Sequence, residues 1–128
     1  MSTAHMLYLK DQKGTLELDE KACYTELAAA CWELLQQHHK DDSIPQHMFR
    51  IKSGKLEIYG GGCDEEEPKE EEELWGDHMN TWGYAEEWIL DGLANNLKGD
   101  GELLFATSTE GWPPNVYKVS PGKVQKIA

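Results

Sequence analysis

The chain has 128 residues, which is enough for one domain with a single hydrophobic core. It carries 24 Asp and Glu against 12 Lys and Arg, so its formal net charge is −12. This charge argues against direct binding of DNA or RNA, because such binding neutralises phosphates with basic side chains. It also argues against attraction to an anionic membrane surface. At 39% hydrophobic residues, the chain nevertheless has the apolar groups needed to fold.

Membrane and compartment signals are weak in this sequence. No segment reaches the roughly 18 apolar residues that cross a bilayer, and Met1–Gln12 lacks the features of a secretory signal. Of three cysteines, Cys23 and Cys31 lie in one expected helix, about 12 Å apart, which is too far for a disulfide. Together with the odd third residue, Cys63, this favours a reduced, cytoplasmic protein.

The first third of the chain predicts a hairpin followed by a helix. Alternating apolar residues indicate strands over residues 5–9 and 15–18, joined by Asp11–Gly14, where glycine can adopt positive φ. Asp19 is expected to cap a helix over residues 20–39, because its side chain can accept a hydrogen bond from the first turn. The buried arc of that helix would contain Cys23, Leu27, Ala30, Cys31, Leu34 and Leu35.

A second hairpin is predicted in the middle of the chain. Its strands would cover residues 47–52 and 55–59, with Ser53–Gly54 as the turn. Because side chains alternate between the faces of a strand, four apolar residues would share its inner face. They are Phe49 and Ile51 on the first strand, and Leu56 and Ile58 on the second.

The last part of the chain predicts a second helix and further strands. The helix would cover residues 81–97 and end before Gly99, a suitable residue after a helix C-cap. Its apolar arc would contain Trp82, Ala85, Ile89, Leu90, Leu93 and Leu97. After a turn at Asp100–Gly101, strands are expected over residues 102–107, 116–119 and 123–127, with a turn at Ser120–Gly122 between the last two.

This order predicts a single α+β domain over residues 1–128. Strands come in adjacent pairs, so we expect a mostly antiparallel sheet built from hairpins and packed with two helices. The expected order is ββ-α-ββ-acidic loop-α-ββ. The acidic loop would lie at about residues 64–74, where the sequence reads DEEEPKEEEE from Asp64 to Glu73.

The negative charge is concentrated in one part of the sequence. Residues 64–102 contain 14 Asp and Glu against Lys69 and Lys98, while the rest of the chain is nearly balanced. Like charges repel one another and destabilise a compact state, and a cationic partner would relieve that repulsion. The alternative is that residues 64–73 form a solvated loop without a role of their own.

The polar side of the second predicted helix also indicates a partner. Tyr84, Trp88, Asp91 and Asn95 recur at helical spacing with Glu87 beside them, and exposed Trp and Tyr are typical of binding interfaces. The alternative is that a neighbouring loop or the sheet covers Trp88. The predicted partner-binding residues are the eight carboxylates of the acidic loop and the five residues of this stripe: Asp64, Glu65, Glu66, Glu67, Glu70, Glu71, Glu72, Glu73, Tyr84, Glu87, Trp88, Asp91 and Asn95.

Motifs for catalysis or metal binding are lacking. No His or Cys pair has the spacing that brings two ligands to one ion, so we expect no metal and no cofactor. Cys63 precedes a run of carboxylates that disfavours its thiolate form. Asp77 and His78 are adjacent in sequence, which is not the geometry of a catalytic base and the residue that orients it. We therefore predict no catalytic residues.

The sequence favours a non-enzymatic acidic protein that docks on a basic surface of a nucleic-acid-handling protein, such as a nuclease, and blocks it as a nucleic-acid mimic. Phage inhibitors of restriction or CRISPR systems, and immunity proteins against nuclease toxins, are of this general type by analogy of composition. One alternative is a small enzyme or small-molecule binder with a pocket between the sheet and the second helix, using Asp77, His78 or Glu86. The other is a structural or oligomerisation module that the acidic loop keeps soluble.

Overall fold

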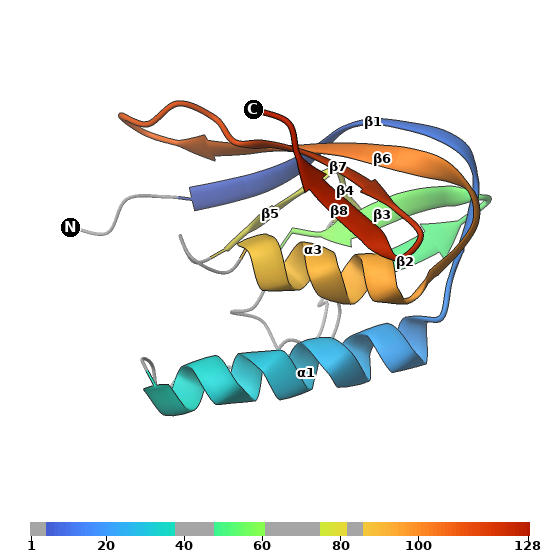
Figure 1. Ribbon diagram of the computed structural model, residues 1–128, viewed down its shortest axis with the longest axis horizontal. Coiled ribbons are helices and arrows are strands. Elements are labelled where there is room, and N and C mark those ends of the chain that lie inside the picture. Colours follow the sequence, from blue (N-terminus) through green and yellow to red (C-terminus); the bar gives the residue numbers. More distant parts are fainter. Residues whose placement is uncertain (1–4, 38–47, 61–74, 82–85) are drawn as a thin grey trace.

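The computed structural model describes residues 5–37, 48–60, 75–81 and 86–128 of the chain. Within these residues the chain forms helix α1 (Glu20–Gln37), helix α3 (Glu86–Asn95) and two antiparallel sheets (Figure 1). The predicted α+β class and the mostly antiparallel pairing are therefore confirmed. Residues 64–74, expected to form the acidic loop, lie outside the described residues.

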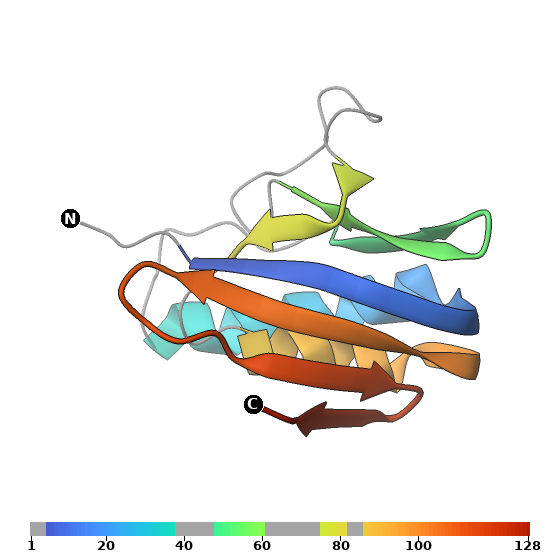
Figure 2. The same ribbon diagram turned by 90° about the horizontal axis from the view of Figure 1, so that it is seen from above.

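The larger sheet has five strands in the order β5-β1-β6-β7-β8. Helix α3 packs against β7 and β8, and helix α1 packs against α3, so both helices lie on one side of this sheet (Figures 1 and 2). Among the described residues, no helix covers its other face. The strands are β1 (His5–Leu18), β5 (His78–Asn80), β6 (Leu97–Thr109), β7 (Val116–Ser120) and β8 (Lys123–Lys126).

The predicted first hairpin is wrong, because β1 is one continuous strand through Asp11–Gly14. It pairs with β6 from His5 to Leu18, with one register shift between Leu9 and Asp11. Gly14 has a φ of +82°, and a Cβ on it would lie 2.3 Å from the carbonyl oxygen of Asp100. This glycine therefore permits the close approach of two long strands and does not form a turn.

Helix α1 begins where its sequence predicts. The Asp19 side chain accepts a hydrogen bond from the backbone N–H of Ala22 at 3.1 Å, which satisfies a donor of the first turn. Cys23, Leu27 and Cys31 are fully buried, as expected from the apolar arc. The Tyr24 hydroxyl also donates to the carbonyl oxygen of Phe49, so α1 is tied to the smaller sheet.

The hairpin of the smaller sheet is confirmed. Strands β2 (Phe49–Lys52) and β3 (Lys55–Tyr59) pair so that Phe49 faces Ile58 and Ile51 faces Leu56. Both turn residues have positive φ, Ser53 at 54° and Gly54 at 79°, which matches the twist of the two strands. A two-residue strand, β4 (Trp75–Gly76), completes this sheet.

The predicted end of the second helix is wrong. Helix α3 stops at Asn95, and strand β6 already begins at Leu97. Gly99 has a φ of +104°, but it lies inside β6, where a Cβ would come within 2.5 Å of the Thr15 carbonyl oxygen. The predicted turn at Asp100–Gly101 is likewise part of β6, because pairing with β1 holds the whole segment extended.

The C-terminal hairpin forms at its predicted turn. Ser120 pairs with Lys123 across Pro121–Gly122, and Gly122 has the positive φ, 75°, that the turn requires. The Gly122 N–H donates to the Ala94 carbonyl oxygen at 2.8 Å, which ties this hairpin to the end of α3. The core between sheets and helices includes Leu7, Leu16, Cys23, Leu27, Phe49, Ile58, Ile89, Leu93, Leu103, Phe105 and Val119.

Candidate functional site

The two helices approach each other closely at Gly92. A Cβ on this residue would lie 2.5 Å from the Cδ2 atom of Leu27, so a larger residue would require the Leu27 side chain or the helices to shift. Leu27 and its neighbours on the buried arc are fully enclosed. This contact brings residues from two distant parts of the sequence onto one exposed surface.

Glu26 of α1 lies against the last turn of α3. Its carboxylate accepts hydrogen bonds from the Asn95 side chain at 3.0 Å and from the Asn96 side chain at 3.5 Å. The Asn96 side chain also donates to the Gly92 carbonyl oxygen at 2.7 Å. These bonds fix a carboxylate of α1 beside the exposed side of α3.

Three carboxylates gather where the helices meet. Partial burial, and then the negative charges of Glu87 and Glu26, raise the pKa of Asp91. Within the described part of the chain, none of the three carboxylates forms an ion pair with Lys or Arg. We refer to Glu26, Glu87, Asp91 and Asn95 as the acidic helix face.

The structure brings together only part of the predicted partner-binding surface. Glu87, Asp91 and Asn95 are exposed, as expected, and Glu26 joins them although the sequence analysis did not single it out. Trp88 is half-buried and packs against the hydrophobic core, which agrees with the alternative that neighbouring segments cover this side chain. Tyr84 and the eight acidic-loop carboxylates lie outside the described residues.

The exposed tryptophan of the helices is instead Trp32, which the sequence analysis did not single out. This α1 side chain is 53% exposed. The helical spacing could have identified it, because Trp32 lies 100° from the buried Cys31. Glu33 follows it and is also exposed. The helices thus present an indole together with carboxylates.

A pocket lies at the end of the molecule where β1 starts. The loop between β6 and β7 and the first turn of α3 reach the same end (Figures 1 and 2). The cavity has a volume of about 340 Å³, and Thr107 contributes to its wall. Its other lining residues, which with Thr107 define the Glu86 pocket, are His5, Glu86, Thr109, Trp112, Pro113 and Asn115.

Glu86, one of the residues considered for a pocket, is buried here, at 6% exposure. Its Oε1 atom accepts a hydrogen bond from the Asn115 side chain at 3.3 Å, and its Oε2 atom lies 3.8 Å from the Nε2 atom of His5. Burial, and then the charges of Glu86 and Glu87, raise the pKa of Tyr117 to about 12. The Glu86 carboxylate therefore sits in a poorly hydrated environment.

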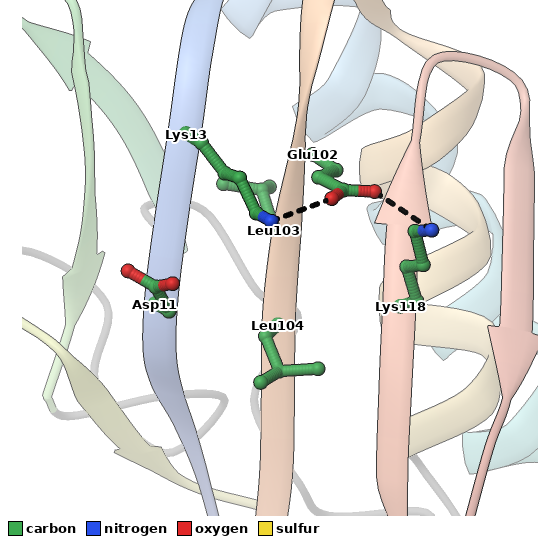
Figure 3. A pocket seen from close by; sticks show the side chains of 6 residues that line it. All are labelled: Asp11, Lys13, Glu102, Leu103, Leu104 and Lys118. Carbon is green, nitrogen blue, oxygen red and sulfur yellow. Dashed lines mark ion pairs between the residues drawn. The ribbon is translucent and has the colours of Figure 1, made fainter.

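The outer face of the larger sheet carries a different arrangement of charge. Glu102 of β6 lies between Lys13 of β1, at 3.2 Å, and Lys118 of β7, at 2.9 Å (Figure 3). The hydrogen bonds from Lys118 and Lys13 lower the pKa of Glu102 despite some desolvation. A shallow cavity of about 170 Å³ lies beside these residues.

The two other residues considered for a pocket lie at the surface. His78 Nδ1 contacts Asp77 Oδ1 at 3.1 Å, and both side chains are more than half exposed. Among the described residues, no group of three His, Cys, Asp or Glu side chains is placed to hold a metal ion. Neither described helix combines the length and apolar character needed to cross a membrane.

Comparison with known protein families, with curated proteins and with solved structures found no match to this chain. Its function is therefore argued from the two sites described above, the acidic helix face and the Glu86 pocket.

Proposed function

We propose that this chain is a non-enzymatic binding protein whose acidic helix face docks on a basic surface of another protein. The preferred partner is a nucleic-acid-handling protein such as a nuclease, whose phosphate-binding surface the carboxylates would occupy. In that case the chain would inhibit its partner by competing with nucleic acid. The observation that supports this best is the group of three carboxylates that have no ion pair with Lys or Arg among the described residues.

The distribution of charge in the fold supports a directed surface. Helices α1 and α3 carry six carboxylates and one basic residue: Glu20, Glu26, Glu33, Glu86, Glu87 and Asp91 against Lys21. Strands β1, β6, β7 and β8 carry four carboxylates and six lysines: Asp11, Glu17, Asp100 and Glu102 against Lys10, Lys13, Lys98, Lys118, Lys123 and Lys126. A basic partner would therefore be steered toward the helices and away from the sheet.

The local electrostatics point in the same direction. Partial burial, and then the charges of Glu87 and Glu26, raise the pKa of Asp91, so its ionisation is unfavourable in the free protein. A lysine or arginine of a partner would offset these negative charges on binding. The exposed indole of Trp32 adds apolar contact area on the same pair of helices.

The test is binding to immobilised basic nucleases and CRISPR effectors over a range of salt concentrations. A variant with Glu26→Gln, Glu87→Gln and Asp91→Asn removes three charges from the acidic helix face. The matched control removes three exposed charges from the sheet strands by Asp11→Asn, Glu17→Gln and Asp100→Asn. We expect the first variant to bind at least about tenfold more weakly, a change of about 1.4 kcal/mol, and the control to bind nearly as the parent does.

Two results would contradict the proposal. Equal weakening in both variants would mean that net charge alone, and not the acidic helix face, governs binding. Binding that does not weaken with added salt would mean that charge plays no part. Converting the eight carboxylates of residues 64–73 to amides tests separately whether that run adds to the affinity.

A further inference from the structure

The Glu86 pocket contains a buried carboxylate oxygen that lacks a donor. The Glu86 side chain is 8% exposed; its Oε1 atom accepts a hydrogen bond from the Asn115 side chain, and the buried Tyr117 hydroxyl is a further neighbour of the carboxylate. The Oε2 atom has no hydrogen-bond partner among the described residues. His5 Nε2 lies 3.8 Å away, which is beyond hydrogen-bond distance. Because a buried carboxylate oxygen without a donor is unfavourable, a ligand that supplies one would be stabilised there.

The histidine ring offers a second acceptor to the same space. His5 is 10% exposed, and its Nδ1 atom is hydrogen-bonded to the Thr109 hydroxyl. In the ring tautomer whose Nδ1 donates to that hydroxyl, Nε2 carries the free lone pair. In that tautomer Nε2 and the Oε2 atom of Glu86 are two acceptors 3.8 Å apart, whereas a proton on Nε2 makes them an ion pair. One ligand group with several N–H donors can satisfy both atoms.

An exposed indole completes the pocket. Trp112 is 73% exposed, although its side chain is one of the most hydrophobic in the protein. The backbone N–H of Trp112 donates to the Thr109 carbonyl oxygen at 3.1 Å, and Gly111 has a φ of +84°, so a tight turn holds this residue beside the cavity. Indole rings attract cations through their π-electrons. The carboxylate and the indole thus both favour a cation.

The bonding of Glu86 also selects the kind of cation. A guanidinium group prefers to bind a carboxylate through two parallel N–H bonds, one to each oxygen, and here it would have to share Oε1 with the Asn115 side chain. An ammonium group needs only the free Oε2 atom. The cavity of about 340 Å³ is at the small end of ligand pockets. We propose that the Glu86 pocket binds the primary ammonium group of a small aliphatic amine or of a lysine side chain.

This site is separate from the acidic helix face and does not depend on the proposed docking. The test titrates the isotope-labelled full chain with n-butylammonium and follows the Trp112 indole N–H signal by NMR. We expect saturable binding of n-butylammonium, weaker binding of n-butylguanidinium, and no saturable binding of n-butanol, which has a similar shape but no charge. Equal affinity for the amine and the alcohol would overturn the proposal.

Two variants locate the binding. Glu86→Gln keeps the shape of the side chain and should weaken the binding of n-butylammonium at least about tenfold, because the charge and the free acceptor are lost. Trp112→Ala should weaken the binding of n-butylammonium about threefold. Because this variant lacks the indole signal, its titration is followed through the His5 ring signals. Glu17→Gln makes the same charge change at the far end of β1 and serves as the control. Unchanged affinity in Glu86→Gln, with the fold intact by circular dichroism, would overturn the proposal.

A final comparison identifies the source of the ammonium group. A short peptide with one internal lysine is titrated beside n-butylammonium, with the Nε-acetylated peptide as its control. Tighter binding of the free amine supports a small-molecule ligand, and tighter binding of the lysine peptide supports a protein ligand. If neither binds saturably, the pocket is not an ammonium site.

Discussion

Glu102 and Asp91 belong to the same acidic part of the sequence, yet the fold gives them opposite environments. On the outer face of the larger sheet, hydrogen bonds from Lys118 and Lys13 lower the pKa of Glu102. On the acidic helix face, partial burial and the charges of Glu87 and Glu26 raise the pKa of Asp91. The difference arises because β6 lies between two strands that each contribute a lysine, whereas α3 packs on a helix that contributes a glutamate.

This comparison changes how the charge of the chain is understood. The sequence places 14 Asp and Glu within residues 64–102, as if they formed one surface. In the fold, Glu102 is neutralised on the sheet and Glu86 is buried. Glu87 and Asp91 remain exposed and have no ion pair with Lys or Arg in the part of the chain that the structure describes. The number of carboxylates in a segment therefore does not determine the potential of a surface.

The largest expected effect on stability comes from Gly92, which holds the acidic helix face together. Gly92→Ala would place a Cβ 2.5 Å from the Leu27 side chain, so either this buried side chain or the helices must shift. We expect the free energy of unfolding, measured in urea, to fall by about 1–3 kcal/mol. The pKa of Asp91, measured by NMR, should move down toward its ordinary value as Glu26 moves away.

Gly76→Ala is the matched control for this variant. No atom lies within 4 Å of the position of its added Cβ, and Gly76 does not have a positive φ. We expect the free energy of unfolding to change by less than about 0.5 kcal/mol. An equal loss of unfolding free energy in the two variants would contradict the role assigned to the contact between Gly92 and Leu27.

A smaller effect is expected from Asp91→Asn. Because the pKa of Asp91 is raised in the folded state, its ionisation opposes folding at neutral pH, and that cost disappears as the pH falls below the unfolded-state pKa of about 3.8. The variant should therefore be more stable than the parent at pH 7, by less than about 1 kcal/mol because the side chain is largely exposed. The two proteins should converge near pH 3. Urea unfolding at both pH values measures this, and a variant less stable at pH 7 would refute it.

The smallest effect is expected on the sheet. The lowered pKa of Glu102 means that its ionisation favours the folded state above the unfolded-state pKa of about 4.5, and this contribution is lost as the pH falls through the folded-state pKa. Lys118→Gln should raise the pKa of Glu102 in an NMR titration, and Lys13→Gln should raise it less, since its contact is longer. An unchanged Glu102 pKa in both variants would show that the lysines do not stabilise its charge.

Local sequence determined several elements of this protein because each depends on residues that are close in the chain. Asp19 caps α1 through its own first turn. Ser53–Gly54 and Pro121–Gly122 can adopt the turn conformations that bring adjacent strands into register. The apolar arc of Cys23, Leu27 and Cys31 faces the core as its spacing predicts.

Part of the candidate sites could also be predicted from sequence. The exposed carboxylates of α3 follow from helical spacing, so Glu87 and Asp91 were predictable. Glu26 was not, because its place beside Asp91 depends on the contact between Gly92 and Leu27. The Glu86 pocket was even less predictable from the sequence, since His5, Glu86 and Asn115 come from three distant segments.

Tertiary structure alone decided the path of the first strand. The stretch Asp11–Gly14 has the composition of a turn, and Gly99 has that of a helix end, yet both lie in the long pairing of β1 with β6. Likewise, Trp88 is half-buried although its helical position suggested exposure. Local sequence patterns indicate which conformations a segment can adopt. Hydrogen bonds and apolar contacts with segments distant in the chain determine which of these conformations forms.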